Sequence, residues 1–267
     1  MMRRWLAQPL NVHPTPPWAT EYERTASVQW QEGVARICNV RHFVYRTRDD
    51  FTPAWYDASY DLDALCSVDL VMSRWAGESV AHVFVSFGFA DGRYLAVSIE
   101  TRRRSDQRYS ALGGFWRNYG LIYVVADERD LLGVRTDVRR ERVCLYRVQM
   151  PDEAKRALFA GYLQRVEALN RRPEFYNTLF NNCTTNVLGH ARAIAPHLRY
   201  DWRILLSGHA DDYAYRMGLL DSSTPFECLK ARSLIRRPAD AQIDEAYSRA
   251  IREQLVSDCS AFRERSA

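Results

Sequence analysis

The chain of 267 residues lacks any run of about 18 apolar residues, so it contains no candidate transmembrane helix. It also lacks a C-x-x-C pair among its six cysteines, which excludes a zinc ribbon and a thioredoxin-type motif. The start, MMRRWLAQPL, is basic, but it has neither the long apolar stretch nor the small-residue cleavage site of a secretory signal. The sequence alone therefore indicates either a cytoplasmic protein or one whose export segment is missing from this chain.

A strong excess of charge is absent as well. Thirty-seven basic residues stand against 33 acidic ones, which gives a net charge of +4. This excess is too small to require a nucleic-acid partner, and we expect none, whereas a weak attraction to anionic lipid or phosphate is compatible with it. The content of 47% hydrophobic and 12% aromatic residues argues against disorder.

Local patterns divide the chain into an arm, one domain and a tail. Residues 8–18 carry four prolines and cannot form a regular helix or a central strand. We therefore expect an extended arm over residues 1–24, a single domain over 25–255 and a tail over 256–267. Strand patterns come early in the domain and amphipathic helices late, over residues 151–173, 183–195 and 243–255, which predicts an α+β fold. The acidic, aromatic stretch 49–65 is predicted to be a loop.

The clearest local signal is a β-hairpin. Two β-rich runs, AHVFVSFGF and YLAVSIE, flank Ala90-Asp91-Gly92-Arg93, and Asp-Gly is a strong turn signal. The side-chain period of two places His82 on the more polar face of the first run and Ser98 and Glu100 on the corresponding face of the second. A three-residue loop puts His82 opposite Glu100, and a two-residue loop puts it opposite Thr101; the sequence leaves both registers open.

The stretch YNTLFNNCTTN places Cys183 in polar surroundings that are unusual for a buried cysteine. Asn181 or Asn182 is predicted to cap a helix whose first turn contains the thiol. Unpaired backbone N–H groups there lower the pKa of a thiol and stabilise an oxyanion. The alternative is a small residue tolerated at a helix start.

A nucleophilic thiol requires a base. His190 lies two helical turns from Cys183, about 10.5 Å along the axis, and does not reach it. His197 and His209 stay open on spacing. His82 is the better candidate because Ser98 or Glu100 on the next strand can orient its ring. The alternative role of Glu100 is a surface ion pair with the arginines at 102–104.

These residues resemble a known family. The order of a histidine strand, a polar strand and a late cysteine at a helix start is similar to that of circularly permuted papain-like thiol enzymes such as the lecithin retinol acyltransferases; the NlpC-type amidases have the unpermuted order. More closely, the chain resembles the bacterial family called the Lnb N-terminal periplasmic domain over roughly residues 25–250. The matching segments are NVRHFVYR, YDLDALCSVDLV, AHVFVSFGFADGRYLAVSIETRR, LIYVVADERDLLGVRTD and FYNTLFNNCTTN.

The resemblance implies a permuted papain-like (NlpC-like) fold, in which an antiparallel sheet packs on helices, with helical additions at the C-terminal end. It implies a cysteine-dependent acyltransferase: Cys183 is the nucleophile, His82 the base and Glu100 the third member. The acyl chain passes from a phospholipid to an amine, as in the N-acylation of lipoproteins, without a metal or cofactor. The family's setting also implies a periplasmic or membrane-peripheral location.

Further roles follow from position in the sequence. Tyr176 and Asn182 lie close to Cys183 and are expected to contact the oxyanion or orient His82, and Arg102, with its neighbours Arg103 and Arg104, is expected to contact lipid phosphate. The alternatives are that Tyr176 only packs at the helix start and that the three arginines are only solvated.

Two other functions remain open from the sequence. The first is a cysteine hydrolase, an amidase or peptidase acting on peptidoglycan or peptides, and the second is a non-catalytic envelope binding module. An apolar pocket, for example one lined by Phe84 or Trp116, would favour acyl transfer over hydrolysis, because transfer requires that water be excluded from the thioester.

Overall fold

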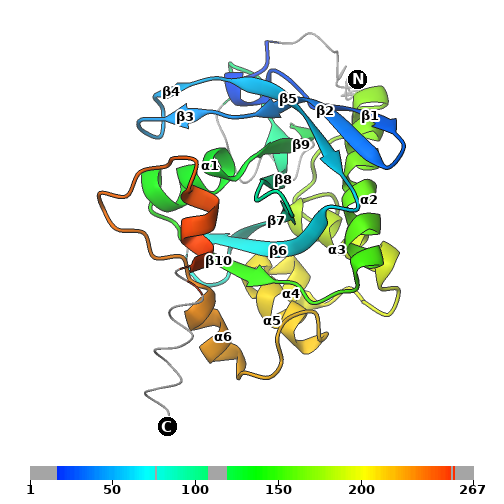
Figure 1. The fold of residues 1–267 in the computed structure, drawn as a ribbon, viewed down its shortest axis with the longest axis vertical. Helices are drawn as coiled ribbons and strands as arrows, with labels where there is room; N and C mark the ends of the chain where they lie inside the picture. The colour runs from blue at the N-terminus through cyan, green and yellow to red at the C-terminus, as the bar shows by residue number, and fades with distance from the viewer. Residues whose placement is uncertain (1–16, 76, 108–118, 254, 256–267) are drawn as a thin grey trace, which may run out of the picture.

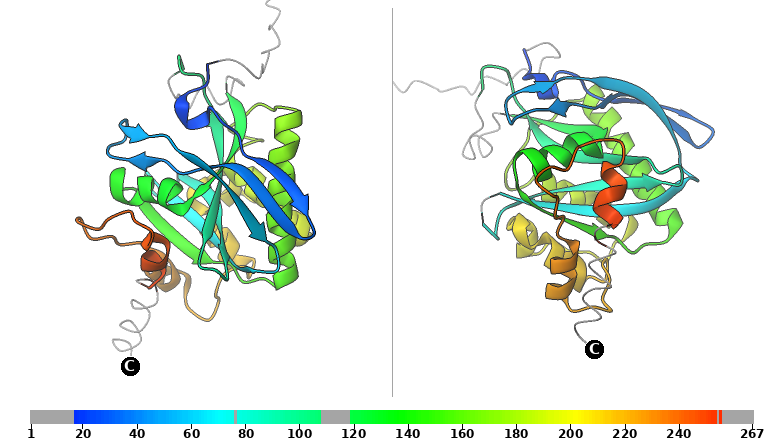
Figure 2. Two further views of the ribbon diagram at one scale, coloured as in Figure 1. Left: turned by 45° about the horizontal axis from the view of Figure 1, so that its top comes forward. Right: turned by 60° about the vertical axis from the view of Figure 1, so that its left-hand side comes forward.

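The computed structural model describes residues 17–75, 77–107, 119–253 and 255. They form an α+β fold around one large mixed sheet, with helices on both of its faces (Figures 1 and 2). Eight strands make this sheet, in the order β1-β2-β9-β8-β7-β6-β10 with β5 paired to β2. Its strands are β1 Ser27–Gln31, β2 Val34–Arg41, β5 Trp55–Asp61, β6 Leu65–Arg74, β7 Ala81–Phe89, β8 Tyr94–Arg102, β9 Gly120–Asp127 and β10 Arg142–Arg147.

The remaining elements cover the sheet and its ends. A small second sheet pairs β3 Val44–Tyr45 with β4 Phe51–Thr52. The helices are η1 Thr20–Tyr22, α1 Glu128–Leu131, η3 Val134–Val138, α2 Asp152–Arg171, α3 Cys183–Ile194, α4 Trp202–Leu205, η4 Ser207–His209, α5 Ala210–Arg216 and α6 Phe226–Ser233. Residues 247–253 are also helical. None of the described helices is long and apolar enough to cross a membrane.

Two expectations about the sheet are wrong. The sheet is not purely antiparallel, because β2 runs parallel to β9 where Arg41 pairs with Ala126. The stretch 49–65 is not a loop, because it contains β4 and β5. Its acidic residues alternate with aromatic and small ones along β5, so that one face of this edge strand packs on the core while the other meets water. A composition rich in Asp masked that period of two.

The predicted hairpin is present, and its register is that of the three-residue loop. The backbone N–H of Phe89 donates to the carbonyl of Arg93, and Val85 pairs with Val97. Among the described residues, no ladder pair joins β7 to β8 before Val85. The first part of β7 pairs only with β6 on this stretch, and the last part of β8 pairs only with β9. The two central strands therefore part from each other at the level of His82.

A buried cluster fills each face of the sheet. Side chains of β7 and β8 on one face pack against α2 and the start of α3, and Cys183 belongs to this cluster. Phe84 packs on the opposite face against α1 and residues 247 and 251. On that face Arg252 donates to Asp69 and Glu128, both almost fully buried, and its guanidinium lies 3.5 Å from the ring centroid of Tyr94. A buried arginine between two carboxylates thus ties the last described helix to the sheet.

Candidate active site

Cys183 is the first residue of α3, as its sequence context predicts. The side chain of Asn182 accepts a hydrogen bond from the backbone N–H of Thr185, and Thr185 Oγ1 accepts one in return from the N–H of Asn182. This capping box satisfies two N–H groups of the helix start and fixes where the helix begins. The thiol that follows is buried, with 8% of the residue exposed.

The pKa of this thiol is not lowered in the structure, contrary to the sequence-based expectation. Burial raises the pKa of Cys183, while hydrogen bonds from the backbone N–H groups of Val83, Thr184 and Cys183 itself, and from the Thr184 hydroxyl, act in the opposite direction. Desolvation is the larger effect, so the resting state holds a neutral thiol. The same N–H groups are arranged to stabilise negative charge that develops beside the sulfur.

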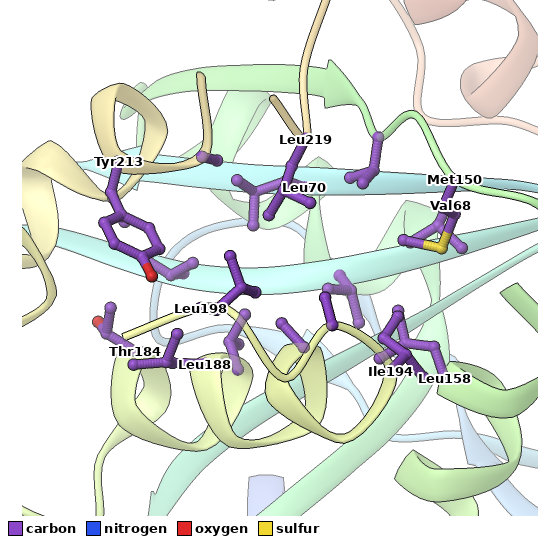
Figure 3. Close-up of a pocket in the computed structure, with 18 of the residues that line it drawn as sticks. Val68, Leu70, Met150, Leu158, Thr184, Leu188, Ile194, Leu198, Tyr213 and Leu219 are labelled. Atoms are coloured by element: carbon purple, nitrogen blue, oxygen red, sulfur yellow. The ribbon is translucent and has the colours of Figure 1, made fainter. Parts of the chain in front are cut away.

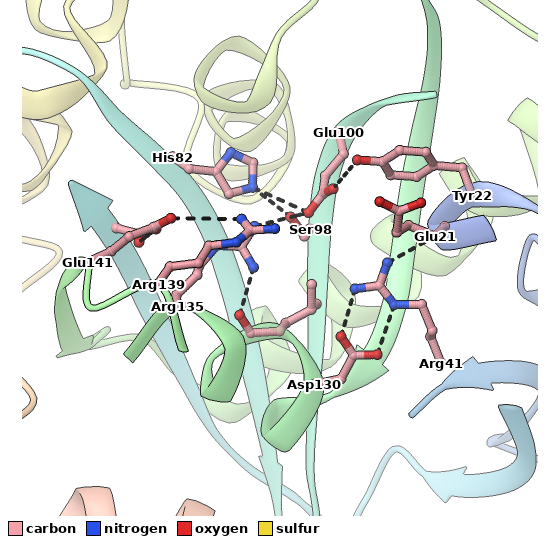
Figure 4. A network of polar contacts seen from close by, with 12 residues as sticks. Glu21, Tyr22, Arg41, His82, Ser98, Glu100, Asp130, Arg135, Arg139 and Glu141 are labelled. Carbon is pink, nitrogen blue, oxygen red and sulfur yellow. Dashed lines mark hydrogen bonds and ion pairs between the residues drawn. The ribbon is translucent and has the colours of Figure 1, made fainter. Parts of the chain in front are cut away.

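His82, Ser98 and Glu100 form a chain of hydrogen bonds at the point where β7 and β8 part (Figure 4). His82 Nε2 lies 2.6 Å from Ser98 Oγ, and Ser98 Oγ donates to Glu100 Oε1 at 2.8 Å. The carboxylate is 3.8 Å from the ring nitrogen. Ser98 therefore stands between the histidine and the acid, and the structure brings together all three of the residues that the hairpin pattern singled out.

The network fixes the tautomer of His82. Burial raises the pKa of Glu100, but the guanidinium of Arg135 and other charges outweigh it and hold that pKa well below its usual range. The ionised carboxylate only accepts, so Ser98 must donate to it and accept the proton of His82 Nε2. Nδ1 is then the unprotonated nitrogen, and it is the one available as a base.

Two residues without a predicted role hold Glu100 in place. Arg135 Nη2 donates to Glu100 Oε1 at 3.1 Å, and the hydroxyl of Tyr22 donates to Oε2 at 3.3 Å. Arg135 lies in η3 and Tyr22 in η1, so neither is near the hairpin in sequence. No local sequence pattern predicts these two contacts, because the residues are brought together only by the tertiary fold.

His82 is neutral at rest. Burial, followed by the positive charge of Arg135, lowers the pKa of His82 to about 3 against the opposing influence of Glu100. Together with the neutral thiol, this gives an uncharged pair in the absence of substrate. A thiolate has to form when the proton leaves for the imidazole during the reaction.

Cys183 and His82 approach the same part of β7, since the backbone N–H of Val83, which directly follows His82, opposes the rise in the pKa of the thiol. The start of α3 contacts both β7 and β8. Within the described part of the chain no hydrogen bond joins the Cys183 sulfur to the imidazole. Helix α3 thus packs on the strand that carries His82, while direct proton transfer requires a further approach of the two side chains.

The neutral His82 makes stability depend on pH. The folded-state pKa of about 3 lies below the ordinary 6.5, so the unfolded chain binds an extra proton between these values and stability falls as the pH drops from 6.5 toward 3. One such proton changes the free energy of unfolding by at most about 1.4 kcal/mol per pH unit. Denaturant unfolding between pH 7.5 and 4.5 is expected to show a shallower decline for His82→Gln than for the wild type. Equal slopes would contradict the neutral buried imidazole.

The other predicted site residues lie elsewhere or act in packing. Tyr176 packs against the cluster that contains Cys183. The side chain of Asn182 is engaged in capping and also donates to the carbonyl of Thr178. Arg102, at the end of β8, donates to the backbone carbonyls of Tyr22 and Glu23, and its described hydrogen bonds reach neither Cys183 nor His82. His190 points to Tyr123, whose hydroxyl is 3.0 Å away, in keeping with the expectation that it does not reach the thiol.

An apolar cavity of about 90 Å³ runs beside the thiol, between α3 and strands β6 and β7 (Figure 3). Thr184 and Val83, which both flank the sulfur, are among its lining residues. Leu188 and Ile194 line it along α3, and Tyr213, Leu219 and Leu70 close the other side. Phe84 is not part of this wall, because it packs on the opposite face of the sheet, and Trp116 lies outside the described residues.

One polar group of this cavity has no partner. The hydroxyl of Tyr162 is buried and makes no hydrogen bond within the described part of the chain. Burial, followed by the charges of Tyr123 and Cys183, raises its pKa well above the ordinary value. An unsatisfied buried hydroxyl carries a desolvation penalty of about 1–3 kcal/mol, which an acceptor on a bound molecule would remove.

The fold and the site define an α+β protein with a cysteine at a helix start and a buried histidine–serine–glutamate chain at a split in the central sheet. The family model of the Lnb N-terminal periplasmic domain matches residues 51–208, which is more than half of the chain and includes all of these residues. The chain belongs to this family. No curated protein and no solved structure matches it.

Proposed function

We propose that the protein is a cysteine-dependent acyltransferase, which moves a fatty acyl chain from a phospholipid through an acyl-thioester on Cys183 to an amine. The N-terminus of a bacterial lipoprotein is the acceptor that the family resemblance favours. The observation that carries the proposal is the apolar cavity that is lined by Thr184 and Val83, which directly follow Cys183 and His82 in the chain. A hydrocarbon chain is the substrate part that such a wall can desolvate.

The cavity also bears on the choice between transfer and hydrolysis. An acyl-thioester survives until an amine arrives only if water is kept from its carbonyl. The buried sulfur and the apolar wall both supply this condition, since 8% of Cys183 is exposed and Thr184 and Val83 lead directly into the cavity. An open polar cleft would have favoured an amidase or peptidase instead.

The chemistry has two half-reactions. In the first, His82 Nδ1 takes the thiol proton, the sulfur attacks the ester carbonyl, and the C–O bond breaks as the imidazolium returns the proton to the leaving lysolipid oxygen. Backbone N–H groups at the start of α3 stabilise the oxyanion between these events. In the second, the amine attacks the thioester carbonyl, the C–S bond breaks, and the amine's proton passes through His82 to the sulfur.

Ser98 and Glu100 act through the histidine. They hold Nε2 protonated, so that Nδ1 is presented as the base, and the carboxylate stabilises the imidazolium that forms after proton transfer. Arg135 and Tyr22 fix Glu100 in turn. The chain's own residues thus supply nucleophile, base and oxyanion donors.

Fold details and location belong to the same proposal. We infer that the helix-borne cysteine packed on a histidine-bearing sheet is a circularly permuted papain-like arrangement. The description of the family places its domain in the periplasm, and we propose the same setting for this protein, with peripheral contact to a phospholipid surface.

The test is intact mass spectrometry after incubation with phospholipid vesicles. An increase by the mass of one acyl chain, removed by hydroxylamine, is the expected result. Vesicles of dialkyl ether phospholipid, which offer the same headgroup without an ester, serve as the matched control and should leave the mass unchanged. Addition of a lipopeptide amine should then discharge the protein and yield N-acyl peptide.

The alternatives give different outcomes in the same experiment. A hydrolase releases free fatty acid or cleaves a peptide regardless of the amine. A non-catalytic binding module associates with vesicles but never gains mass, which would refute the acyl-enzyme.

A further inference from the structure

A second cavity, of about 380 Å³, lies near the ends of β8 and β9, where they adjoin the last turns of α2. It is distinct from the apolar one, because its wall mixes core side chains with polar and charged ones. The charged and polar residues among its lining are Glu23, Arg24, Asn39, Arg102 and Asn170, together with the indole of Trp18.

Arg102 stands out because it forms no ion pair with an acidic residue of the described part of the chain. Its Nε and Nη2 donate to the backbone carbonyls of Tyr22 and Glu23, at 3.1 and 3.3 Å. Its neighbours behave differently: Arg103 faces Glu21, and Arg104 forms an exposed ion pair with Asp106. Within the described part of the chain Nη1 of Arg102 makes no hydrogen bond.

Burial disfavours the charged form of this guanidinium. Burial lowers the pKa of Arg102 to about 10, and no carboxylate of the described residues counteracts this shift. A cation that is removed from water without a counter-charge is costly, so an anion at this position would be held.

A second unsatisfied donor lies beside it. The guanidinium carbon of Arg102 sits 4.3 Å from the ring centroid of Trp18, and the indole Nε1 is buried without a hydrogen-bond partner among the described residues. Both groups can only donate. Arg24 adds another positive charge to the wall, against the single carboxylate of Glu23.

We propose that this cavity is a binding site for a phosphate group, held by Arg102 and by the indole N–H of Trp18. A tetrahedral phosphate offers oxygens in several directions, which suits donors that approach from different sides. The cavity is larger than one phosphate, so it has room for the part of a molecule to which the phosphate is attached.

Tyr22 connects this site to the histidine chain. Its carbonyl accepts from Arg102 and its hydroxyl donates to Glu100. An occupied phosphate site would therefore hold η1, and with it the hydroxyl of Tyr22, which donates to Glu100 alongside Arg135 and Ser98. The proposal does not depend on acyl transfer, because phosphate binding is measurable without any acyl donor.

The experiment titrates inorganic phosphate against the protein by thermal shift and isothermal calorimetry, at constant ionic strength maintained with chloride. Wild type is compared with Arg102→Gln, which removes the charge, and Trp18→Phe, which keeps the ring but removes the N–H. Arg104→Gln is the matched control. It removes the same charge two residues along the chain, from an arginine that is in an exposed ion pair. We expect phosphate affinity to fall at least tenfold in the first two variants and to stay unchanged in the control.

A second arm identifies the source of the phosphate. Sedimentation with phosphatidylglycerol vesicles, with and without free phosphate, is expected to show binding that competes with phosphate and weakens in Arg102→Gln if a lipid headgroup is the occupant. Phosphate binding without any such competition assigns the site to a soluble phosphate compound. Equal phosphate affinity in all four proteins, or a response no larger than that to chloride, would overturn the proposal.

Discussion

Cys183→Ala protein incubated with phospholipid vesicles is expected to gain no acyl mass, and acyl transfer to an amine is expected to fall at least ~10⁴-fold, to the uncatalysed background. The reason is that the reaction proceeds through a covalent bond to the sulfur, which no neighbouring group replaces. Cys183→Ser should be equally inactive. Its hydroxyl can still accept hydrogen bonds from the N–H groups that surround this position. It is a far weaker acid than the thiol, however, and hence a poor nucleophile here.

The exposed Cys66 supplies the control. Cys66→Ala should retain wild-type acylation, because this exposed thiol lies in β6 and donates to the carbonyl of Ala64, away from Cys183 and His82. Thermal melts of all three variants establish that they fold. Transfer by well-folded Cys183→Ala would mean that the sulfur carries no acyl group, and the capped helix start would then be purely structural.

His82→Gln is expected to slow formation of the acyl-enzyme by about 10²–10⁴-fold, the usual contribution of a positioned general base. The structure makes this dependence strong, since the thiol is neutral at rest and cannot ionise without a proton acceptor. Glutamine retains a group able to hydrogen-bond Ser98 but cannot take the proton. Single-turnover kinetics with excess protein measure the step directly.

His190→Gln is the matched variant, because His190 is also substantially buried and its pKa is also lowered, to about 4, chiefly by burial. It contacts Tyr123 and stacks on Tyr162 rather than approaching the site, so its acylation rate should remain within a few-fold of the wild type. The acylation rate of Ser98→Ala should lie between those of the two histidine variants. The imidazole stays in place, but the hydrogen bond that fixes its tautomer is lost. Equal rates for both histidine variants would exclude His82 as the base.

The features that the sequence predicts well are those encoded within a few residues. The Asp-Gly turn sets the hairpin, and the asparagine before Cys183 sets the start of α3, so His82, Ser98 and Glu100 were placed on the correct faces from periodicity alone. The register was left open between two loop lengths. It is settled by packing of Val85 and Val97 into the buried cluster, which is a tertiary effect.

Features made by distant segments could not be predicted. The contact between Arg135 and Glu100 spans 35 positions, and the cavity wall is assembled from β6, β7, α2, α3 and α5. The thiol of Cys183 shows why a pKa is hard to predict from the sequence. Its position at a helix start was correct, but the pKa follows from how deeply the helix packs on the sheet, and no local pattern reports this depth.

The buried arginine near the end of the described chain has a consequence for folding. Asp69 in β6 and Glu128 in α1 are almost fully buried, and Arg252, which pairs with both, follows Asp69 by 183 residues. Asp69 has a second ion pair with Arg147, but burying both carboxylates without Arg252 would be costly. This face of the sheet therefore reaches its full stability only when residues 247–253 have docked, so segments that are far apart in the chain should fold together in one cooperative step rather than strand by strand.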